Sequence, residues 1–217
     1  MIDATLAALI QDNTTIVVPS VLPDISLRLV TFELPWWLAD PKELEAQGIV
    51  DPYWAFCWPG GMALSRYLAD RPTVVAGKSV MDFGAGCGVV AIAAAKAGAA
   101  RVIACDIDQV ALWACAENAA LNGLMLDLEG RDLVGSELPG VDVLLVGDVT
   151  YSREMVERLI PWFESLRAAG KTILVADPGR GYLPQSLVAE AIIRLPPDLG
   201  EVPVAPSVTV PIYSFNP

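Results

Sequence analysis

The chain has 217 residues, of which 54% are hydrophobic, and 26 acidic residues outnumber 14 basic ones to give a net charge of −12. This length is enough for one domain with a substantial core and a small extension. The acidic balance would repel a phosphate-rich partner, so binding of nucleic acid is not expected. The sequence contains no histidine, and its cysteines form no C-x-x-C pair, which argues against a metal cofactor and against histidine-based triads.

The sequence predicts neither a membrane span nor a targeting segment. No stretch of about 18 residues is free of charged side chains, which is roughly the minimum for a membrane-crossing helix. The N-terminus has no basic region followed by an apolar run, and it is not rich in arginine. A cytoplasmic location is therefore expected.

Residues 1–45 are predicted to form an N-terminal extension, and residues 46–217 the main domain. Residues 3–11 suit a short helix, and two short extended pieces are expected within residues 14–34, which prolines interrupt. A helix is predicted from Asp40 to Glu45, because an N-cap residue is followed directly by proline. The aromatic side chains nearby are Trp36, Trp37 and Trp54. The sequence leaves open whether they form a lid, a docking surface for a partner protein or ordinary core.

Beyond this region, short apolar runs rich in valine, isoleucine and leucine alternate with helical stretches, which indicates a parallel sheet with helical crossovers. The predicted strands cover residues 79–83, 101–105, 124–128, 141–147 and 171–176. The predicted helices cover residues 60–69, 88–97, 108–122 and 152–168. Residues 189–195 and 207–215 are expected to pair antiparallel at the sheet edge, because the proline-containing segment between them leaves little room for a helix.

The first predicted strand of this sheet runs into three glycines at alternate positions, Gly84, Gly86 and Gly88. Backbone without side chains lets a ligand lie against the strand ends, and the amides of these glycines are expected to approach it. The next strand ends in Asp106, 22 residues beyond Gly84. An acid at this point can accept hydrogen bonds from both hydroxyls of a ribose. The sequence therefore predicts a site for a nucleoside-bearing cofactor.

The glycine spacing is not the dinucleotide fingerprint G-x-G-x-x-G, whose third glycine sits one place later. With Asp82 two residues before the first glycine, the segment reads D-x-G-x-G-x-G. It resembles the first motif of the seven-strand S-adenosylmethionine-dependent methyltransferases. The resemblance implies an α/β fold of Rossmann-like type, with a mostly parallel, doubly wound sheet of seven strands and an antiparallel C-terminal strand pair.

Three further segments resemble the D-x-x-Y group of protein lysine methyltransferases: Trp58-Pro59-Gly60-Gly61, Asp148-Val149-Thr150-Tyr151 and Asp177-Pro178-Gly179-Arg180. Within that group the chain is most similar to the enzymes that methylate lysines of the electron transfer flavoprotein β-subunit. This similarity is carried by residues 51–123 and by the C-terminal Ser214-Phe215-Asn216-Pro217. The resemblance covers about residues 45–217. It implies S-adenosylmethionine as methyl donor, S-adenosylhomocysteine as product, no metal, and the flavoprotein β-subunit as protein substrate.

The resemblance also assigns roles to single residues. Asp82 would hold the amino group of the donor and Asp106 its ribose hydroxyls, with Ile107 beside them. Asp132 would contact the adenine amine, unless it pairs with Arg131. Together with the three glycines, the remaining cofactor-binding candidates are Leu133 against the adenine ring, Trp58 over the methionine end or in the core, and Asp148.

Asp148, at the end of a predicted strand, is the catalytic candidate, with Tyr151 as a wall of the lysine channel. Only a neutral lysine amine can attack the methyl carbon, and deprotonation at pH 7.4 costs roughly 4 kcal/mol. A nearby sulfonium and burial both lower the pKa of the lysine, whereas a carboxylate raises it. Asp148 is therefore expected mainly to recruit and align the ammonium group. The alternative role for Asp148 is a helix N-cap.

Other functions remain open from sequence. The acceptor is the flavoprotein, another protein such as a ribosomal protein, or a small cationic metabolite. A nicotinamide-dependent oxidoreductase is disfavoured by the glycine spacing and by the missing Tyr-x-x-x-Lys pair, since Met155 and Ser186 stand where that lysine is required. A catalytically silent binding module is disfavoured by the intact acidic positions.

Overall fold

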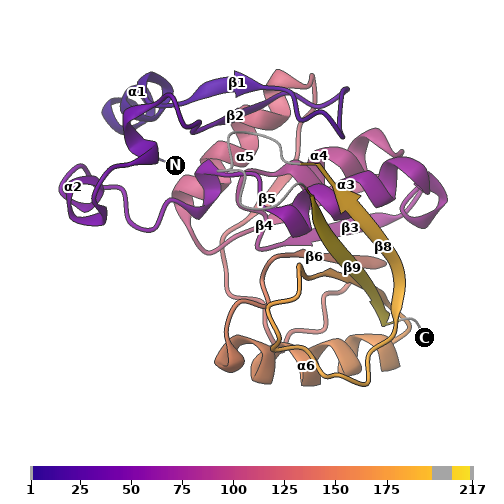
Figure 1. Cartoon of the computed structure of the whole chain (residues 1–217). Coiled ribbons are helices and arrows are strands. Elements are labelled where there is room, and N and C mark those ends of the chain that lie inside the picture. The colour runs from indigo at the N-terminus through magenta and orange to yellow at the C-terminus, as the bar shows by residue number, and fades with distance from the viewer. Residues whose placement is uncertain (1, 197–206, 216–217) are drawn as a thin grey trace.

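The computed structural model describes residues 2–196 and 207–215, and within them seven strands form one sheet in the order β5-β4-β3-β6-β7-β9-β8 (Figure 1). Strands β3 to β7 pair parallel with one another, whereas β9 is antiparallel to both β7 and β8. This confirms the mostly parallel sheet with an antiparallel C-terminal pair at its edge. The strands are β3 (Ser79–Phe83), β4 (Arg101–Cys105), β5 (Asp127–Glu129), β6 (Val143–Gly147), β7 (Thr172–Ala176), β8 (Ala189–Leu195) and β9 (Val208–Phe215).

Helices cover both faces of the sheet, as the doubly wound prediction requires. Side chains along a strand point to alternate faces, so Val80 packs with α3 and α4 while Met81 packs with α6. In Figure 1, α6 lies on the opposite side of the sheet from α3 and α4. Burial on both faces explains the continuous apolar strands. The helices are α3 (Pro59–Asp70), α4 (Val89–Lys96), α5 (Gln109–Leu121) and α6 (Arg153–Ala168).

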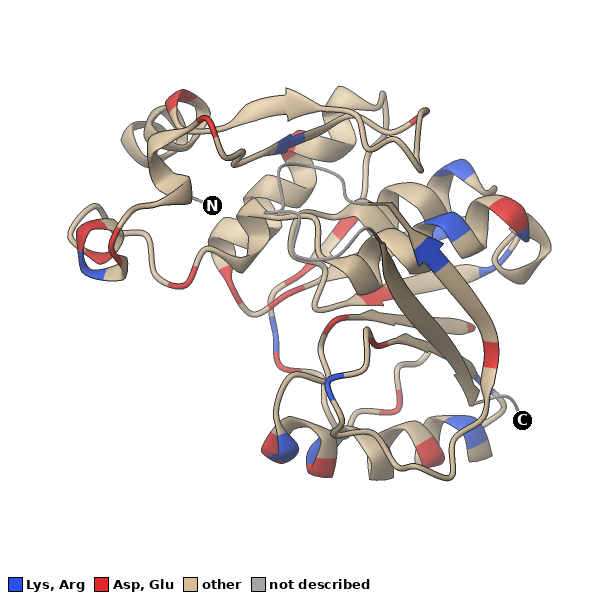
Figure 2. Cartoon of the chain, in the orientation of Figure 1, with Lys and Arg blue, Asp and Glu red and all other residues tan. Residues whose placement is uncertain are grey.

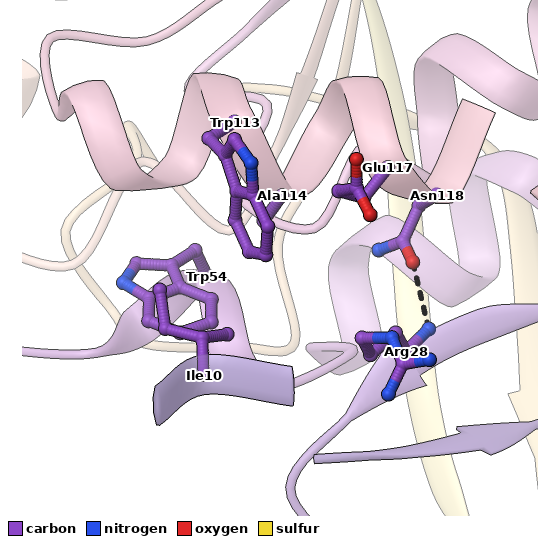
Figure 3. A pocket seen from close by; sticks show the side chains of 7 residues that line it. All are labelled: Ile10, Arg28, Trp54, Trp113, Ala114, Glu117 and Asn118. Atoms are coloured by element: carbon purple, nitrogen blue, oxygen red, sulfur yellow. Dashed lines mark hydrogen bonds between the residues drawn. The ribbon is translucent and has the colours of Figure 1, made fainter. Parts of the chain in front are cut away.

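The N-terminal segment packs against α5 through a small cluster of its own. Trp36 and Trp54 are buried in this cluster with Ala114 of α5, so the core interpretation is correct for these two tryptophans. The Asn118 side chain of α5 accepts a 2.7 Å hydrogen bond from the Arg28 backbone N–H (Figure 3). The elements here are α1 (Ala4–Asp12), β1 (Thr15–Val17), β2 (Leu27–Leu29), α2 (Pro41–Glu45) and the short 3-10 helices η1 (Pro35–Trp37), η2 (Tyr53–Ala55) and η3 (Pro72–Val74).

The expected strand at residues 124–128 is displaced, because β5 begins only at Asp127. Leu124 and Leu126 pack against the core from backbone that precedes the strand. The apolar run therefore reflects packing and not pairing with β4. The segment 197–206, for which the sequence predicts no helix, lies outside the described residues. None of the helices in the described part of the chain has the length and apolar character of a membrane span.

The packing of α6 on the sheet yields a stability prediction. Leu159 is fully buried between α6 and the strands, so Leu159→Ala should lower the free energy of unfolding by about 2–5 kcal/mol in urea denaturation. The matched control is Glu157→Ala on the exposed side of the same helix, which should change it by no more than about 0.5 kcal/mol. Equal effects of the two substitutions would contradict this packing.

Candidate functional site

A crevice with about 310 Å³ of open space lies at the carboxyl ends of β3 and β6. Parallel strands end at the same edge of a sheet, which brings residues distant in sequence together there. The crevice is lined by Phe56, Trp58, Gly61, Asp82, Gly84, Ala85, Gly86, Cys87, Val89, Val90 and Gly147. Four of the candidate residues, Trp58, Asp82, Gly84 and Gly86, thus line one cavity.

The glycine-rich loop is shaped by its packing against the rest of the sheet edge. Gly84 has a φ of +70°, and a Cβ atom there would come within 2.5 Å of the Val149 side chain. The N–H of Gly84 donates to the Cys105 carbonyl, and that of Gly86 donates to the Asp106 carboxylate at 2.9 Å. The Gly88 N–H is likewise used within the loop. Gly84 and Gly86, which line the crevice, therefore offer bare surface to a ligand. The amides of all three glycines donate to groups of the protein itself, so their expected approach to a ligand stays a prediction.

Asp82 is a buried carboxyl group at the floor of the crevice. The residue is 1% exposed, and one carboxyl oxygen accepts a 3.0 Å hydrogen bond from the Ala91 N–H in the first turn of α4. Burial raises the pKa of Asp82 to about 7, and the nearby charge of Asp106 adds to that shift. A carboxyl group with this pKa gains its charge at neutral pH, and a cation bound beside it would favour ionisation.

Asp106 is held at the end of β4 by two backbone groups. Its oxygens accept hydrogen bonds from the N–H groups of Gly86, at 2.9 Å, and Asp108, at 3.0 Å. Burial raises the pKa of Asp106, and these hydrogen bonds oppose the shift. The neighbouring Ile107 is 72% exposed. Asp106 is thus fixed beside the glycine-rich loop with its carboxylate oriented by the loop itself.

Trp58 forms part of an aromatic wall of the crevice. Its indole N–H donates a 2.8 Å hydrogen bond to the Tyr53 carbonyl, and its ring centroid lies 5.8 Å from that of Phe56. Both Trp58 and Phe56 line the crevice. The indole N–H is therefore satisfied by the protein, which leaves the ring face as the part of Trp58 available to a ligand.

Asp132 and Leu133 do not line the crevice. The Asp132 carboxylate pairs with Arg158 of α6 at 2.6 Å and accepts a hydrogen bond from the Val134 N–H. Arg131 pairs with Glu129 instead, so the alternative pairing of Asp132 with Arg131 is wrong. Leu133 is partly buried against the core on the α6 side of the sheet. A contact of either residue with an adenine ring stays a prediction.

Asp148 follows the last residue of β6 with its backbone in the left-handed region, at a φ of +59°. One carboxylate oxygen accepts a 3.1 Å hydrogen bond from the Gly61 N–H, and the other binds the Arg180 guanidinium at 2.9 Å. Burial raises the pKa of Asp148, while Arg180 and the N–H groups at the start of α3 oppose the shift. The N-cap alternative is wrong, because the Ser152 hydroxyl caps α6.

The start of α3 fits closely against the Asp148 side chain. A Cβ atom at Gly60 would come within 2.4 Å of the Asp148 carboxylate and 2.8 Å of the Ala176 carbonyl. Residue 60 must therefore be glycine for the carboxylate to occupy its place. Tyr151 lies three residues after Asp148 and is 54% exposed, and its place as a wall of the lysine channel stays a prediction.

Sequence reasoning noted Asp177 and Arg180 as parts of a motif but gave them no role. Asp177 is buried, and one of its oxygens accepts hydrogen bonds from the N–H groups of Gly179 and Arg180, at 2.6 and 2.8 Å. The Thr150 hydroxyl donates to its other oxygen. The sequence did contain a signal for the partner of Asp148. Arg180 follows β7 closely, and β7 is the sheet neighbour of β6, which Asp148 follows.

The raised pKa of Asp82 predicts a pH-dependent effect of its removal. The folded protein holds this proton up to about pH 7, whereas an unfolded chain releases it near pH 3.9. Ionisation therefore costs stability increasingly from pH 4 to 7. Asp82→Asn should leave the melting temperature of the cofactor-free protein unchanged at pH 4 and raise it by at least about 4 °C at pH 8.

Calorimetric melting curves across that pH range check the expectation. The matched control is Asp70→Asn, which alters an exposed carboxyl group on α3. A difference between Asp82→Asn and wild type that stays constant from pH 4 to 8 would show that Asp82 ionises as an ordinary carboxyl group.

The chain is similar in sequence and in fold to known methyltransferases. A family model described as "Ribosomal protein L11 methyltransferase (PrmA)" matches residues 63–145. Among solved structures, SMU.776, described as a methyltransferase and complexed with SAH, superposes with a TM-score of 0.60 at 13% identity, covering 93% of this chain and 55% of its own. At such low identity the likeness shows the fold alone.

Similarity over most of the chain is found with a named group of enzymes. The electron transfer flavoprotein beta subunit lysine methyltransferase of Danio rerio is 41% identical over 189 residues, which are 86% of this chain and 72% of that protein. Its counterpart in Homo sapiens is 38% identical over 182 residues, covering 82% and 68% of the two chains. The chain belongs to the family of electron transfer flavoprotein β-subunit lysine methyltransferases.

Proposed function

We propose that this chain transfers methyl groups from S-adenosylmethionine to lysine side chains of the electron transfer flavoprotein β-subunit. The relatives named for that activity are similar to this chain over more than four-fifths of its length. The observation that carries the proposal is the position of Asp148. Its carboxylate is bonded to Gly61, and it follows Gly147 directly, and both of these glycines line the crevice. An acceptor bound at Asp148 would thus lie at the border of the crevice.

The crevice fits the proposed methyl donor in its chemistry. S-adenosylmethionine, when bound, supplies a methyl group on a positively charged sulfur, together with an ammonium group and ribose hydroxyls. Asp82 has one hydrogen bond from Ala91, whereas a carboxylate has about four acceptor sites, so it would hold the ammonium group. Asp106 would accept from the ribose hydroxyls. Trp58 would present its ring face to the methionine end.

Asp148 would hold the acceptor nitrogen. Gly61 and Arg180 use two of its roughly four acceptor sites, which leaves room for a further donor such as a lysine amine. Only 7% of the side chain is exposed, so a single narrow group is all that can reach it. Holding two reactants in line contributes about 7–11 kcal/mol in favourable cases. Asp148 would therefore act by placing the nitrogen and not as a strong base.

Two further observations bear on the class of acceptor. The match to the ribosomal protein L11 methyltransferase model ends at residue 145, before Asp148, so it supports the cofactor half of the site and leaves the acceptor open. The chain has a net charge of −12, and acidic residues occur on α2, on α6 and along the loops (Figure 2). Such a surface attracts a lysine-bearing protein and repels nucleic acid. The cytoplasmic location and the absence of a metal stay predictions.

The proposed reaction is tested with a labelled methyl donor and the purified flavoprotein. We expect label on the β-subunit when wild-type enzyme is present. Label that appears on other proteins of a lysate, or on a small amine, but not on the β-subunit would contradict the proposed acceptor and favour one of the alternatives.

The role of Asp106 predicts a selective loss of donor affinity. Asp106→Asn replaces a charged acceptor by a neutral one, so calorimetry should show binding of S-adenosylmethionine weakened by about 10-fold or more. The matched control, Asp127→Asn, removes an exposed partner of Arg101 and should bind as wild type does. Wild-type protein that binds NAD in preference to S-adenosylmethionine would contradict the assignment and support the oxidoreductase alternative.

The role of Asp148 predicts a loss of methyl transfer without a loss of donor affinity. Asp148→Ala should reduce methyl transfer by about 100-fold or more, because the acceptor nitrogen loses its alignment, while the affinity for S-adenosylmethionine stays within about threefold. The control is Asp142→Asn, which lies just before the other end of β6 and should remain active. Activity that survives in Asp148→Ala would show that Asp148 does not hold the acceptor.

A further inference from the structure

The ion pair between Asp148 and Arg180 is not explained by a carboxylate whose only task is to recruit a lysine ammonium group. The pair joins Asp148 Oδ1 to the Arg180 guanidinium at 2.9 Å, with side chains that are 7% and 31% exposed. An arginine at this distance already satisfies the charge of Asp148. A positively charged lysine that approaches the same carboxylate is therefore met by a second positive charge.

Arg180 is held in place by a separate network below it. The buried Asp177 accepts hydrogen bonds from the backbone N–H groups of Gly179 and Arg180, and it accepts a further one from the Thr150 hydroxyl. Thr150 lies two residues after Asp148. The loops that follow β6 and β7 are thus tied together twice, once through Asp177 and once through the Arg180 guanidinium.

We propose that Arg180 is a positioning residue for methyl transfer. It orients the Asp148 carboxylate and neutralises its charge, so that the acceptor lysine is held there as a neutral amine. The proposal rests on the proposed function, because it concerns the lysine that Asp148 would hold. It extends that function, since it assigns to this chain a residue that promotes the loss of the lysine proton to solvent water, before the N–C bond to the methyl group forms and the S–C bond of the donor breaks to leave S-adenosylhomocysteine.

The electrostatic reasoning compares the site with and without the guanidinium. A lone, nearly buried carboxylate would bind a lysine ammonium ion tightly and raise the pKa of that lysine by about 1–3 units. Such an ion pair would align the nitrogen but keep it protonated and unreactive. With Arg180 in place, the carboxylate and the guanidinium cancel, and the carboxylate still accepts a hydrogen bond from the amine. The positive sulfonium of the proposed donor then favours the neutral amine.

The charged groups around Asp148 are few. Arg180 approaches from the loop after β7, and Asp177 of that loop is engaged by the loop's own N–H groups. The start of α3 contributes only the backbone of Gly60 and Gly61. Arg180 is therefore the charged side chain that contributes to the pKa of Asp148 in the described part of the chain.

The test is the pH dependence of the maximal rate of methyl transfer for wild type, Arg180→Gln and Arg180→Lys, from pH 6.5 to 10. The rising limb of this profile reports the pKa of the amine in the complex. In Arg180→Gln we expect this limb to move upward by about 1–3 pH units. Its rate should be about 10-fold or more below wild type at pH 7.5 and approach wild type at pH 10. Arg180→Lys, which keeps the charge but not the planar fork, should keep the wild-type limb.

A loss that is the same at every pH, or a limb in Arg180→Lys that moves as far as in Arg180→Gln, would overturn the proposal and leave Arg180 a structural clip. The matched control is Arg167→Gln, which removes an exposed ion pair on α6 and should leave the profile unchanged. Wild-type enzyme that labels no flavoprotein at any pH would contradict the proposed function itself. An active wild type with an unshifted Arg180→Gln contradicts the role of Arg180 alone.

A second readout does not depend on activity. Without the guanidinium, the pKa of the buried Asp148 rises further, so Arg180→Gln should lose more stability relative to wild type as the pH increases from 4 to 8. Thermal unfolding at several pH values measures this difference. A difference that does not change with pH would show that the ion pair does not control the charge of Asp148, and it would also overturn the proposal.

Discussion

Three carboxylates at the carboxyl edge of one parallel sheet, one buried and two partly buried, are the constraint on which the site depends. Asp82, Asp106 and Asp148 lie in or directly after β3, β4 and β6, which are adjacent strands. Each carboxylate accepts at least one hydrogen bond from a backbone N–H. These bonds aim the side chains and offset part of the cost of burying them. The remaining acceptor capacity is what a positively charged, hydroxyl-bearing ligand can use.

The same edge explains why the glycines are necessary. At Gly84 a side chain would collide with Val149, and at Gly60 it would collide with Asp148 itself. Both collisions involve the segment that follows β6. The glycine-rich loop therefore packs against Val149, and the start of α3 packs against the catalytic candidate Asp148. The cofactor site and the acceptor site are thus parts of one packed unit.

Most of the fold follows from sequence pattern, because strands buried on both faces must be apolar and the helices between them must cover both faces. Predicted and observed bounds of β3 and β4 coincide. β5 was misplaced because Leu124 and Leu126 are apolar for packing reasons alone. Asp82 and Asp106 were found through the motif and its spacing. The crevice brings Asp82 together with Trp58, which the motif alone did not show.

Side-chain pairing was the part that sequence did not provide. Nothing in the local pattern distinguishes Arg158 from Arg131 as the partner of Asp132, because the choice depends on where α6 lies relative to the loop after β5. The pairing of Arg180 with Asp148 spans 32 residues and depends on β6 and β7 being sheet neighbours. Ion pairs of this kind are set by topology, and they decide the charge on the residue that matters for catalysis.

The central claim is that the crevice beside the glycine-rich loop holds an adenosyl compound with Asp148 at its border. A crystal structure of the protein with S-adenosylhomocysteine tests this most directly. The account predicts density in the crevice, with the amino group of the ligand near Asp82 and its ribose hydroxyls within hydrogen-bond distance of Asp106. An empty crevice at saturating ligand, or ligand bound elsewhere on the chain, would contradict it.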